Sequence, residues 1–112
     1  MARDFDDAVR SYVVTCFAAG TAPRVDELAQ LLGMHPAALS RSYKSSTGCH
    51  LSVVLKTAQL EEAKRLLRET ELSVDEIALR AGFGTPNTLF RTFRLRVGTT
   101  PDRYRLSARV DR

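Results

Sequence analysis

Apolar residues recur every three or four positions along most of the chain, which is the spacing of one face of an α-helix. Near the N-terminus this spacing predicts a first helix that ends close to Gly20. The apolar face of that helix consists of Phe5, Val9, Tyr12, Val13 and Phe17. No segment shows the convincing alternation of a half-buried strand, so the pattern predicts an all-α fold.

Residues 51–68, which lie within the longest stretch without glycine or proline, predict a single helix of about 27 Å. Its apolar residues are Leu51, Val53, Val54, Leu55, Leu60, Leu66 and Leu67. They do not form one narrow stripe, and a helix that is contacted on two sides explains this distribution.

Two segments of the chain repeat each other. VDELA at residues 25–29 returns as VDEIA at residues 74–78, and Gly33 returns as Gly82, at an offset of 49 residues. The second copy has one additional residue in its turn, so Pro36 corresponds to Pro86. Each copy predicts a short helix, a glycine turn and a second helix that begins at a proline, which is the pattern of a helix-turn-helix. Two copies are too few for a solenoid array.

Further start signals complete a prediction of seven helices. Ser73 with Glu76 indicates a capping box, and Thr85 and Thr100 each precede a proline as N-caps. We therefore expect two helix-turn-helix subdomains joined by a long central helix. The expected boundaries are residues 1–50 for the first subdomain with its N-terminal helix, 51–69 for the connecting helix and 70–112 for the second subdomain.

Helical spacing divides each repeat into a core face and an exposed face. The predicted core residues are Leu28, Ala29, Leu32, Leu39 and Tyr43 in the first repeat and Leu89 and Phe93 in the second. The predicted exposed stripes are Ala37, Ser40, Arg41 and Lys44 in the first and Asn87, Phe90, Arg91 and Arg94 in the second. Small, polar and basic groups thus share one stripe per repeat. Phe90 fits the core equally well, and the sequence leaves this alternative open.

The positive charge is concentrated in the second half of the chain. The formal net charge is +4, yet residues 1–48 hold equal numbers of basic and acidic side chains. Residues 86–109 hold six arginines and one acidic residue. Such a distribution favours a polyanionic partner. We expect Arg103, Arg105 and Arg109 to be structural or solvent-facing, with Arg105 tying the last helix to the fold.

Composition and the N-terminus indicate a cytoplasmic protein. The 44% apolar content can supply a core, but no apolar run approaches the roughly 20 residues of a membrane-spanning helix. The N-terminal residues MARDFDD are acidic where a secretory signal would be basic. We expect no membrane association, and we expect Cys16 and Cys49 to stay reduced.

Catalytic chemistry has little support in the sequence. The thiols and imidazoles are limited to Cys16, His35, Cys49 and His50. On a helix, the neighbouring Cys49 and His50 side chains would diverge by about 100°. No pair of them has metal-ligand spacing, and no glycine-rich phosphate loop is present. We expect no enzyme activity, no metal site and no cofactor.

The exposed stripes suit the major groove of DNA, which admits a helix and displays a different donor and acceptor pattern for each base pair. Arg41 and Arg91 can each form paired hydrogen bonds with guanine, Asn87 with adenine, and Phe90 can contact a thymine methyl group. Basic side chains closer to the helix ends suit phosphates; these are Lys44, Arg94 and Arg96. A connecting helix of about 27 Å would separate the two readers by a distance comparable to the 34 Å helical repeat of DNA.

The second repeat resembles the DNA-binding domain of AraC/XylS-type transcriptional regulators. The matching residues are Ile77, Ala78, Gly82, Phe83, Leu89, Arg91, Phe93, Gly98, Pro101, Tyr104 and Arg105. Similarity extends back through LAQLLGMHPAALSRSYKSSTG and so covers about residues 25–105. The resemblance implies a fold of seven helices that binds promoter DNA to regulate transcription, with RNA polymerase as a further partner.

By this resemblance, the base-reading positions are Ala37, Ser40 and Arg41 in the first repeat and Pro86, Asn87, Thr88, Phe90 and Arg91 in the second. The chain departs from the family where relatives often have a larger side chain than Ala37 and a small polar residue in place of Phe90. The first reader is therefore expected to specify fewer bases than the second. Family members usually carry a separate effector-binding or dimerisation domain, so the chain is expected to be a standalone member or an excised domain.

A helical module that docks on RNA polymerase or on another regulator, without reading DNA, is the alternative function. We expect the chain to bind DNA as a monomer, since two readers are already present in it.

Overall fold

The computed structural model describes residues 2–110, with side chains described for residues 5–109, and this part of the chain forms seven helices and no strand. The helices are α1 (Ala2–Ala19), α2 (Val25–Leu31), α3 (Pro36–Thr47), α4 (Leu51–Glu69), α5 (Val74–Arg80), α6 (Pro86–Val97) and α7 (Pro101–Val110). This all-α architecture of two helix-turn-helix units and a long central helix confirms the predicted fold class.

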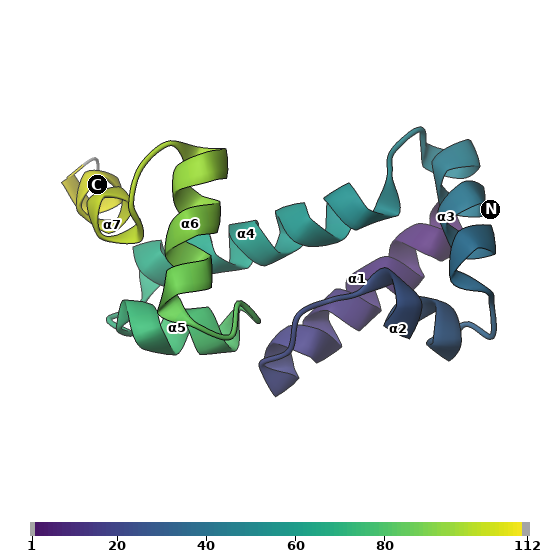
Figure 1. Cartoon of the computed structure of the whole chain (residues 1–112), viewed down its shortest axis with the longest axis horizontal. Helices are drawn as coiled ribbons and strands as arrows, with labels where there is room; N and C mark the ends of the chain where they lie inside the picture. The colour runs from purple at the N-terminus through teal and green to yellow at the C-terminus, as the bar shows by residue number, and fades with distance from the viewer. Residues whose placement is uncertain (1, 111–112) are drawn as a thin grey trace.

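Helix α4 joins two separate hydrophobic cores (Figure 1). In the first lobe, α1, α2 and α3 pack against the beginning of α4, where Leu51 and Leu55 are buried. In the second lobe, α5 and α6 pack against its other end, where Leu60 and Leu67 are buried. The molecule is elongated, 42 × 25 × 22 Å. The leucines of α4 are spread around the helix because each lobe covers a different part of it, as their distribution predicts.

Three side chains cap the helices at the positions that the sequence indicates. The Ser73 hydroxyl accepts from the amide of Glu76 at 3.1 Å, that of Thr85 from Thr88 at 3.2 Å, and that of Thr100 from Arg103 at 3.2 Å. These bonds satisfy amides that have no partner within the first turn of a helix. The Glu76 carboxylate accepts from the Arg80 guanidinium at 3.2 Å instead of reaching back to Ser73, so only half of the predicted capping box forms.

Leu32 does not face the core as the sequence predicts. Helix α2 ends at Leu31, and Leu32, the C-cap residue, is 40% exposed. Helical spacing does not apply to a residue outside the helix. The buried residues of α2 are therefore Leu28 and Ala29. In α1, Phe17 of the predicted apolar face is only partly buried, whereas the adjacent Cys16 is buried.

Two arginines attach α7 to the C-terminal end of α4. The Arg105 guanidinium donates to the carbonyl oxygens of Leu67, Thr70 and Leu72 at 3.0, 3.2 and 2.6 Å. Arg109 donates to the Thr70 carbonyl at 2.7 Å. Leu67 is in the last turn of α4, where carbonyl groups have no partner within the helix, and Thr70 and Leu72 follow that helix. The guanidinium groups satisfy acceptors in both segments. The expectation that Arg105 ties the last helix to the fold is confirmed.

Candidate nucleic-acid interface

A glycine turn with a shared beginning precedes the second helix of each repeat, and the second copy is one residue longer. The amide of Met34 donates to the carbonyl oxygen of Ala29, and that of Phe83 to Ala78, both at 2.8 Å. Gly33 and Gly82 take positive φ angles of 67° and 81°, a conformation that side chains rarely allow. The turns therefore begin alike, and in the longer second turn Gly84 also takes a positive φ angle, of 82°.

Buried anchors determine which faces of α3 and α6 remain exposed. Leu39 and Tyr43 of α3 are 0% and 4% exposed, and Leu89 and Phe93 of α6 are both 0% exposed. Since these pairs are four residues apart, they hold one face of each helix against its core. The opposite faces are turned outward, as the spacing predicts.

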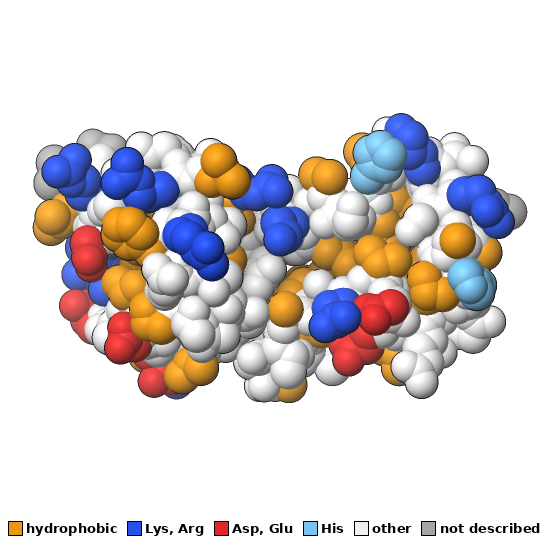
Figure 2. Space-filling model, viewed as in Figure 1, with side chains coloured by type: hydrophobic (Ala, Val, Ile, Leu, Met, Phe, Trp, Pro, Cys, Tyr) orange, Lys and Arg blue, Asp and Glu red, His pale blue; other side chains and the backbone are white. Residues whose placement is uncertain are grey.

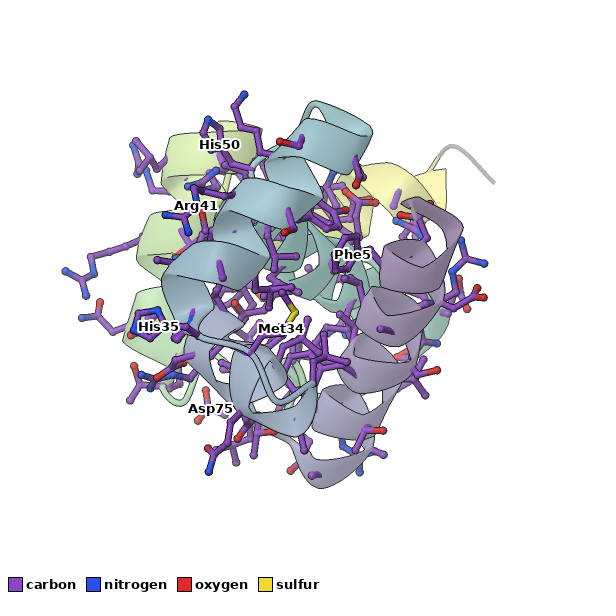
Figure 3. The ribbon with its side chains drawn as sticks, turned by 90° about the vertical axis from the view of Figure 1, so that its right-hand side faces the viewer. Phe5, Met34, His35, Arg41, His50 and Asp75 are labelled. Carbon is purple, nitrogen blue, oxygen red and sulfur yellow. The ribbon has the colours of Figure 1, made fainter. Side chains whose placement is uncertain are left out.

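The predicted residues of α3 all lie on its outward face. Ala37, Ser40, Arg41 and Lys44 are exposed, and Arg41 extends away from the body of the molecule (Figure 3). Small side chains at two of these four positions leave the helix backbone accessible between the cations. This surface can approach a partner closely along the first half of the helix.

Helix α6 carries the other predicted residues. Asn87, Phe90, Arg91 and Arg94 are exposed on its outward face, and Pro86 and Arg96, near the two ends of the helix, are exposed as well. Phe90 is 41% exposed, so it is not a core residue, and the alternative left open by the sequence is decided in favour of the surface. Thr88 is different: it is partly buried, and its hydroxyl lies 3.0 Å from that of Thr85, with which it shares a hydrogen bond. A base contact by Thr88 would therefore compete with the helix cap.

Helices α3 and α6 lie on the same side of the molecule. In Figure 3, the labelled Arg41 on α3 points toward the side on which α6 lies, in the second lobe behind it. Figure 2 shows Lys and Arg side chains along the upper part of both lobes, whereas Asp and Glu gather along the lower part. One elongated surface therefore combines both helices with positive charge.

The cations on α3 and α6 differ in pairing from those elsewhere. On α4 and α5, Lys64, Arg65 and Arg80 each form an ion pair with a glutamate one turn away. Within residues 5–109, no ion pair with Asp or Glu involves the predicted DNA-contacting cations, which are Arg41, Lys44, Arg91, Arg94 and Arg96. A surface of unpaired cations attracts polyanions more strongly than one whose charges are neutralised locally.

Sequence reasoning missed one residue of this surface. His35 is the N-cap of α3, and its Nδ1 accepts from the Ala37 amide at 3.2 Å. The sequence contains a signal for this cap, because His35 directly precedes Pro36 just as the predicted cap Thr85 directly precedes Pro86. His35 and His50 are both exposed and point toward the same side as Arg41 (Figure 3).

Neither a metal centre nor a membrane segment is found in the described part of the chain. Its His, Cys, Asp and Glu residues form no group of three or more that could hold a metal ion. None of the described helices has the length and apolar character that crossing a bilayer requires.

Two helix-turn-helix units on one central helix, each presenting an exposed basic second helix on the same side, define a DNA-binding domain of the kind found in transcription regulators. A family model described as a helix-turn-helix domain matches residues 28–107. The chain belongs to this family, the AraC-type helix-turn-helix domains, and the resemblance stated from the sequence is confirmed.

Named relatives agree with this assignment. Over 87 residues the chain is 41% identical to the HTH-type transcriptional regulator Rv1931c of Mycobacterium tuberculosis, covering 78% of this chain and 34% of that protein. It is 33% identical over 82 residues to the probable transcription factor PqrA of Proteus vulgaris, covering 73% of this chain and 67% of that protein. The chain thus spans about a third of the first relative and about two thirds of the second.

A solved structure with a similar fold contains DNA. The DNA-binding domain of AdpA, a global transcriptional factor crystallised in complex with a target DNA, has a TM-score of 0.78 and 31% identity to this chain. The match covers 93% of this chain and 95% of that one. The comparisons place the chain among DNA-binding transcription regulators and not among enzymes.

Proposed function

We propose that this domain binds promoter DNA in a sequence-specific manner by inserting α3 and α6 into two successive major grooves. The observation that carries the proposal is the common orientation of the two helices, each buried along one face and lined with unpaired cations along the other. At about 1.5 Å per residue, the 19 residues of α4 span about 28 Å, close to the 34 Å helical repeat of DNA.

Each residue type has a role that matches its position. Arg41 and Arg91 form paired hydrogen bonds with guanine, Asn87 pairs with adenine, and the exposed Phe90 contacts a thymine methyl group. Other predicted positions line the grooves and limit which bases fit; these are Ala37, Ser40, Pro86 and Thr88. The cations toward the helix C-termini neutralise phosphates; these are Lys44, Arg94 and Arg96.

The two readers contribute unequally to specificity. Ala37 offers no hydrogen-bonding group, so α3 reads bases mainly through Ser40 and Arg41. Helix α6 offers Asn87, Phe90 and Arg91, which together distinguish more base pairs. Promoter recognition is therefore stronger in the box that α6 contacts.

The wider setting follows from this role. The similar AdpA domain was crystallised in complex with a target DNA. We therefore assign double-stranded DNA as the partner of this chain. RNA polymerase is a further partner of the domain. The domain binds DNA as a monomer, because it carries both readers. Binding takes place in the cytoplasm. The division into units at residues 1–50, 51–69 and 70–112 is part of the same proposal, and it is supported by the two cores that meet on α4.

Selection of bound duplexes from a random DNA pool tests the proposal. The expected result is two short boxes whose centres lie about one helical turn apart, with the longer consensus in one of them. A single box would contradict the use of both readers. Failure to enrich any sequence at low salt, together with capture of purified RNA polymerase, would support the protein-docking alternative instead.

A further inference from the structure

Gly33 and Gly82 occupy corresponding positions and both take positive φ angles, but their surroundings differ. A Cβ atom built on Gly33 would meet nothing within 4 Å. One built on Gly82 would lie 2.7 Å from the Cα atom and the amide nitrogen of Ala22 and 2.8 Å from the carbonyl carbon of Thr21. Ala22 and Thr21 belong to the loop between α1 and α2, so the turn of the second lobe touches the backbone of the first.

The first-lobe side of this contact is held firmly. The Thr21 amide donates to the Cys16 carbonyl at 2.9 Å, and the Thr21 hydroxyl donates to the same carbonyl at 3.3 Å. Three residues after Thr21, the Arg24 amide donates to the Tyr12 phenol at 2.8 Å. The loop is therefore tied to α1 at both ends and offers a fixed wall to the second lobe.

The second-lobe side is equally constrained. Ala81, directly before Gly82, is 0% exposed, whereas Leu32, its equivalent in the first repeat, is 40% exposed. Phe83, directly after Gly82, packs against the second core. Helix α1 also packs against α5, and the end of α1 lies beside the α5–α6 turn (Figure 1). The contact thus joins two rigid parts, and only a residue without a side chain fits between them.

We propose that this seam, formed by Gly82 and the loop at residues 20–22, fixes the separation and relative orientation of α3 and α6. Helix α4 by itself is one connection, about which the lobes can twist and bend. The seam, together with the packing of α1 against α5, is a second connection beside it, and two connections define an orientation. A consequence for DNA follows, and it rests on the proposed two-groove binding. The seam sets the spacing between DNA boxes that the domain accepts. Gly82 is a positioning residue in this sense, since it faces the other lobe and not the DNA.

Gly82→Ala and Gly33→Ala are a matched pair of variants. Both introduce a methyl group at a positive φ angle at corresponding positions of the two repeats, but only Gly82→Ala places it against the other lobe. Distances between spin labels on Cys49 and on Leu106→Cys report the arrangement of the lobes without DNA, because both sites are exposed, in different lobes, and Cys16 is buried. We expect a longer or broader distance distribution for Gly82→Ala and an unchanged one for Gly33→Ala. Identical distributions in the two variants would overturn the proposal.

A second variant covers the case in which Gly82→Ala does not fold, as circular dichroism would reveal. One glycine inserted between Thr21 and Ala22 loosens the seam from the first lobe and leaves the second turn intact. We expect this insertion to broaden the same distance distribution. If the distribution stays as narrow as in the wild type, the seam does not hold the lobes.

DNA binding provides the functional readout. For the selected two-box duplex and a duplex with one additional base pair between the boxes, we expect a large affinity ratio in the wild type. The ratio should fall severalfold in Gly82→Ala and stay constant in Gly33→Ala, even where Gly33→Ala weakens binding to both duplexes. An unchanged ratio in Gly82→Ala would contradict the link to spacing. If the wild type binds no two-box DNA, the proposed function fails, while the label distances still decide whether the seam exists.

Discussion

At the scale of single residues, the arginines of this chain differ in function because their neighbours differ. Arg105 donates to backbone carbonyls at the end of α4, and Arg80 pairs with Glu76 on α5. Arg41 and Arg91 are exposed, and neither forms an ion pair with a described acid. The guanidinium group is the same in all four, so the local supply of acceptors decides whether it holds the fold together or stays available to a ligand.

Replacing Arg91 tests base reading directly. Arg91→Ala is expected to weaken binding by about 1–3 kcal/mol and to relax the preference at one base position, because a paired hydrogen bond to guanine is lost. Affinities for duplexes carrying each of the four base pairs at that position provide the measurement. Arg80→Ala is the control, since it also removes one positive charge but lies on α5 in an ion pair. An equal loss for all four duplexes would make Arg91 a phosphate contact.

The environment of Tyr12 leads us to expect that the free energy of unfolding falls at alkaline pH. Burial, together with the hydrogen bond that the phenol donates to Glu27 at 2.6 Å, raises the pKa of Tyr12 above its ordinary value of 10.0. The folded state therefore keeps a proton that the unfolded state releases, so the free energy of unfolding is highest below pH 10 and falls as the pH rises further.

Urea unfolding from about pH 8 to about pH 11 measures this effect. Tyr12→Phe is expected to be less stable at neutral pH by about 1 kcal/mol, because it loses the hydrogen bonds to Glu27 and from the Arg24 amide. Its stability should also decline less steeply in alkali than that of the wild type. Parallel declines in the two proteins would show that Tyr12 does not contribute to the pH dependence.

At the scale of the elements, local sequence rules account for most helix boundaries. Pro36, Pro86 and Pro101 each stand at the first position of a helix, and Gly48 and Gly98 end α3 and α6 in the left-handed conformation. These signals act between residues close in the sequence, so they can be identified without knowledge of the fold. The docking of one element on another depends on distant partners, as between α7 and α4.

Removing Arg105 tests that docking. Arg105→Ala is expected to lower the free energy of unfolding by about 2 kcal/mol, because charged hydrogen bonds to three carbonyl oxygens are lost and these acceptors remain partly buried. Arg103→Ala is the matched control: Arg103 is an exposed arginine of the same helix, and its loss should change stability by less than about 0.5 kcal/mol. Chemical denaturation gives both values. Equal effects would mean that Arg105 does not hold α7 in place.

At the scale of the whole molecule, the lobes combine two small readers into one basic surface. Each lobe has its own core, and α4 belongs to both. The acids lie mainly along the lower part of the view in Figure 2, whereas the exposed cations follow the upper part of both lobes. Separation of charge on this face lets a domain of modest net charge, +4, attract a polyanion in one orientation.

Salt dependence measures the size of this contact. With about six phosphates neutralised, the logarithm of the binding constant is expected to fall with the logarithm of salt concentration at a slope near −5, owing to counterion release. Lys44→Ala should reduce the magnitude of that slope by about 1 and weaken all sequences equally. Titrations of one duplex over a range of salt concentrations provide the slope. A slope near zero would exclude a surface that contacts phosphates on both lobes.

The sequence by itself determined the helical class, the repeat, the capped helix starts and the outward stripes of α3 and α6. These features depend on periodicity and on neighbours within one turn, and they are readable from residues such as Thr85, Leu89 and Phe93. Tertiary structure alone decided that Phe90 is exposed, that Leu32 leaves the core and which carbonyl oxygens Arg105 binds. Tertiary structure also decided that Gly82 contacts the other lobe, whereas Gly33 faces open space. The physical reason is that exposure and partners depend on residues far away in the chain, which are brought close only when the helices pack.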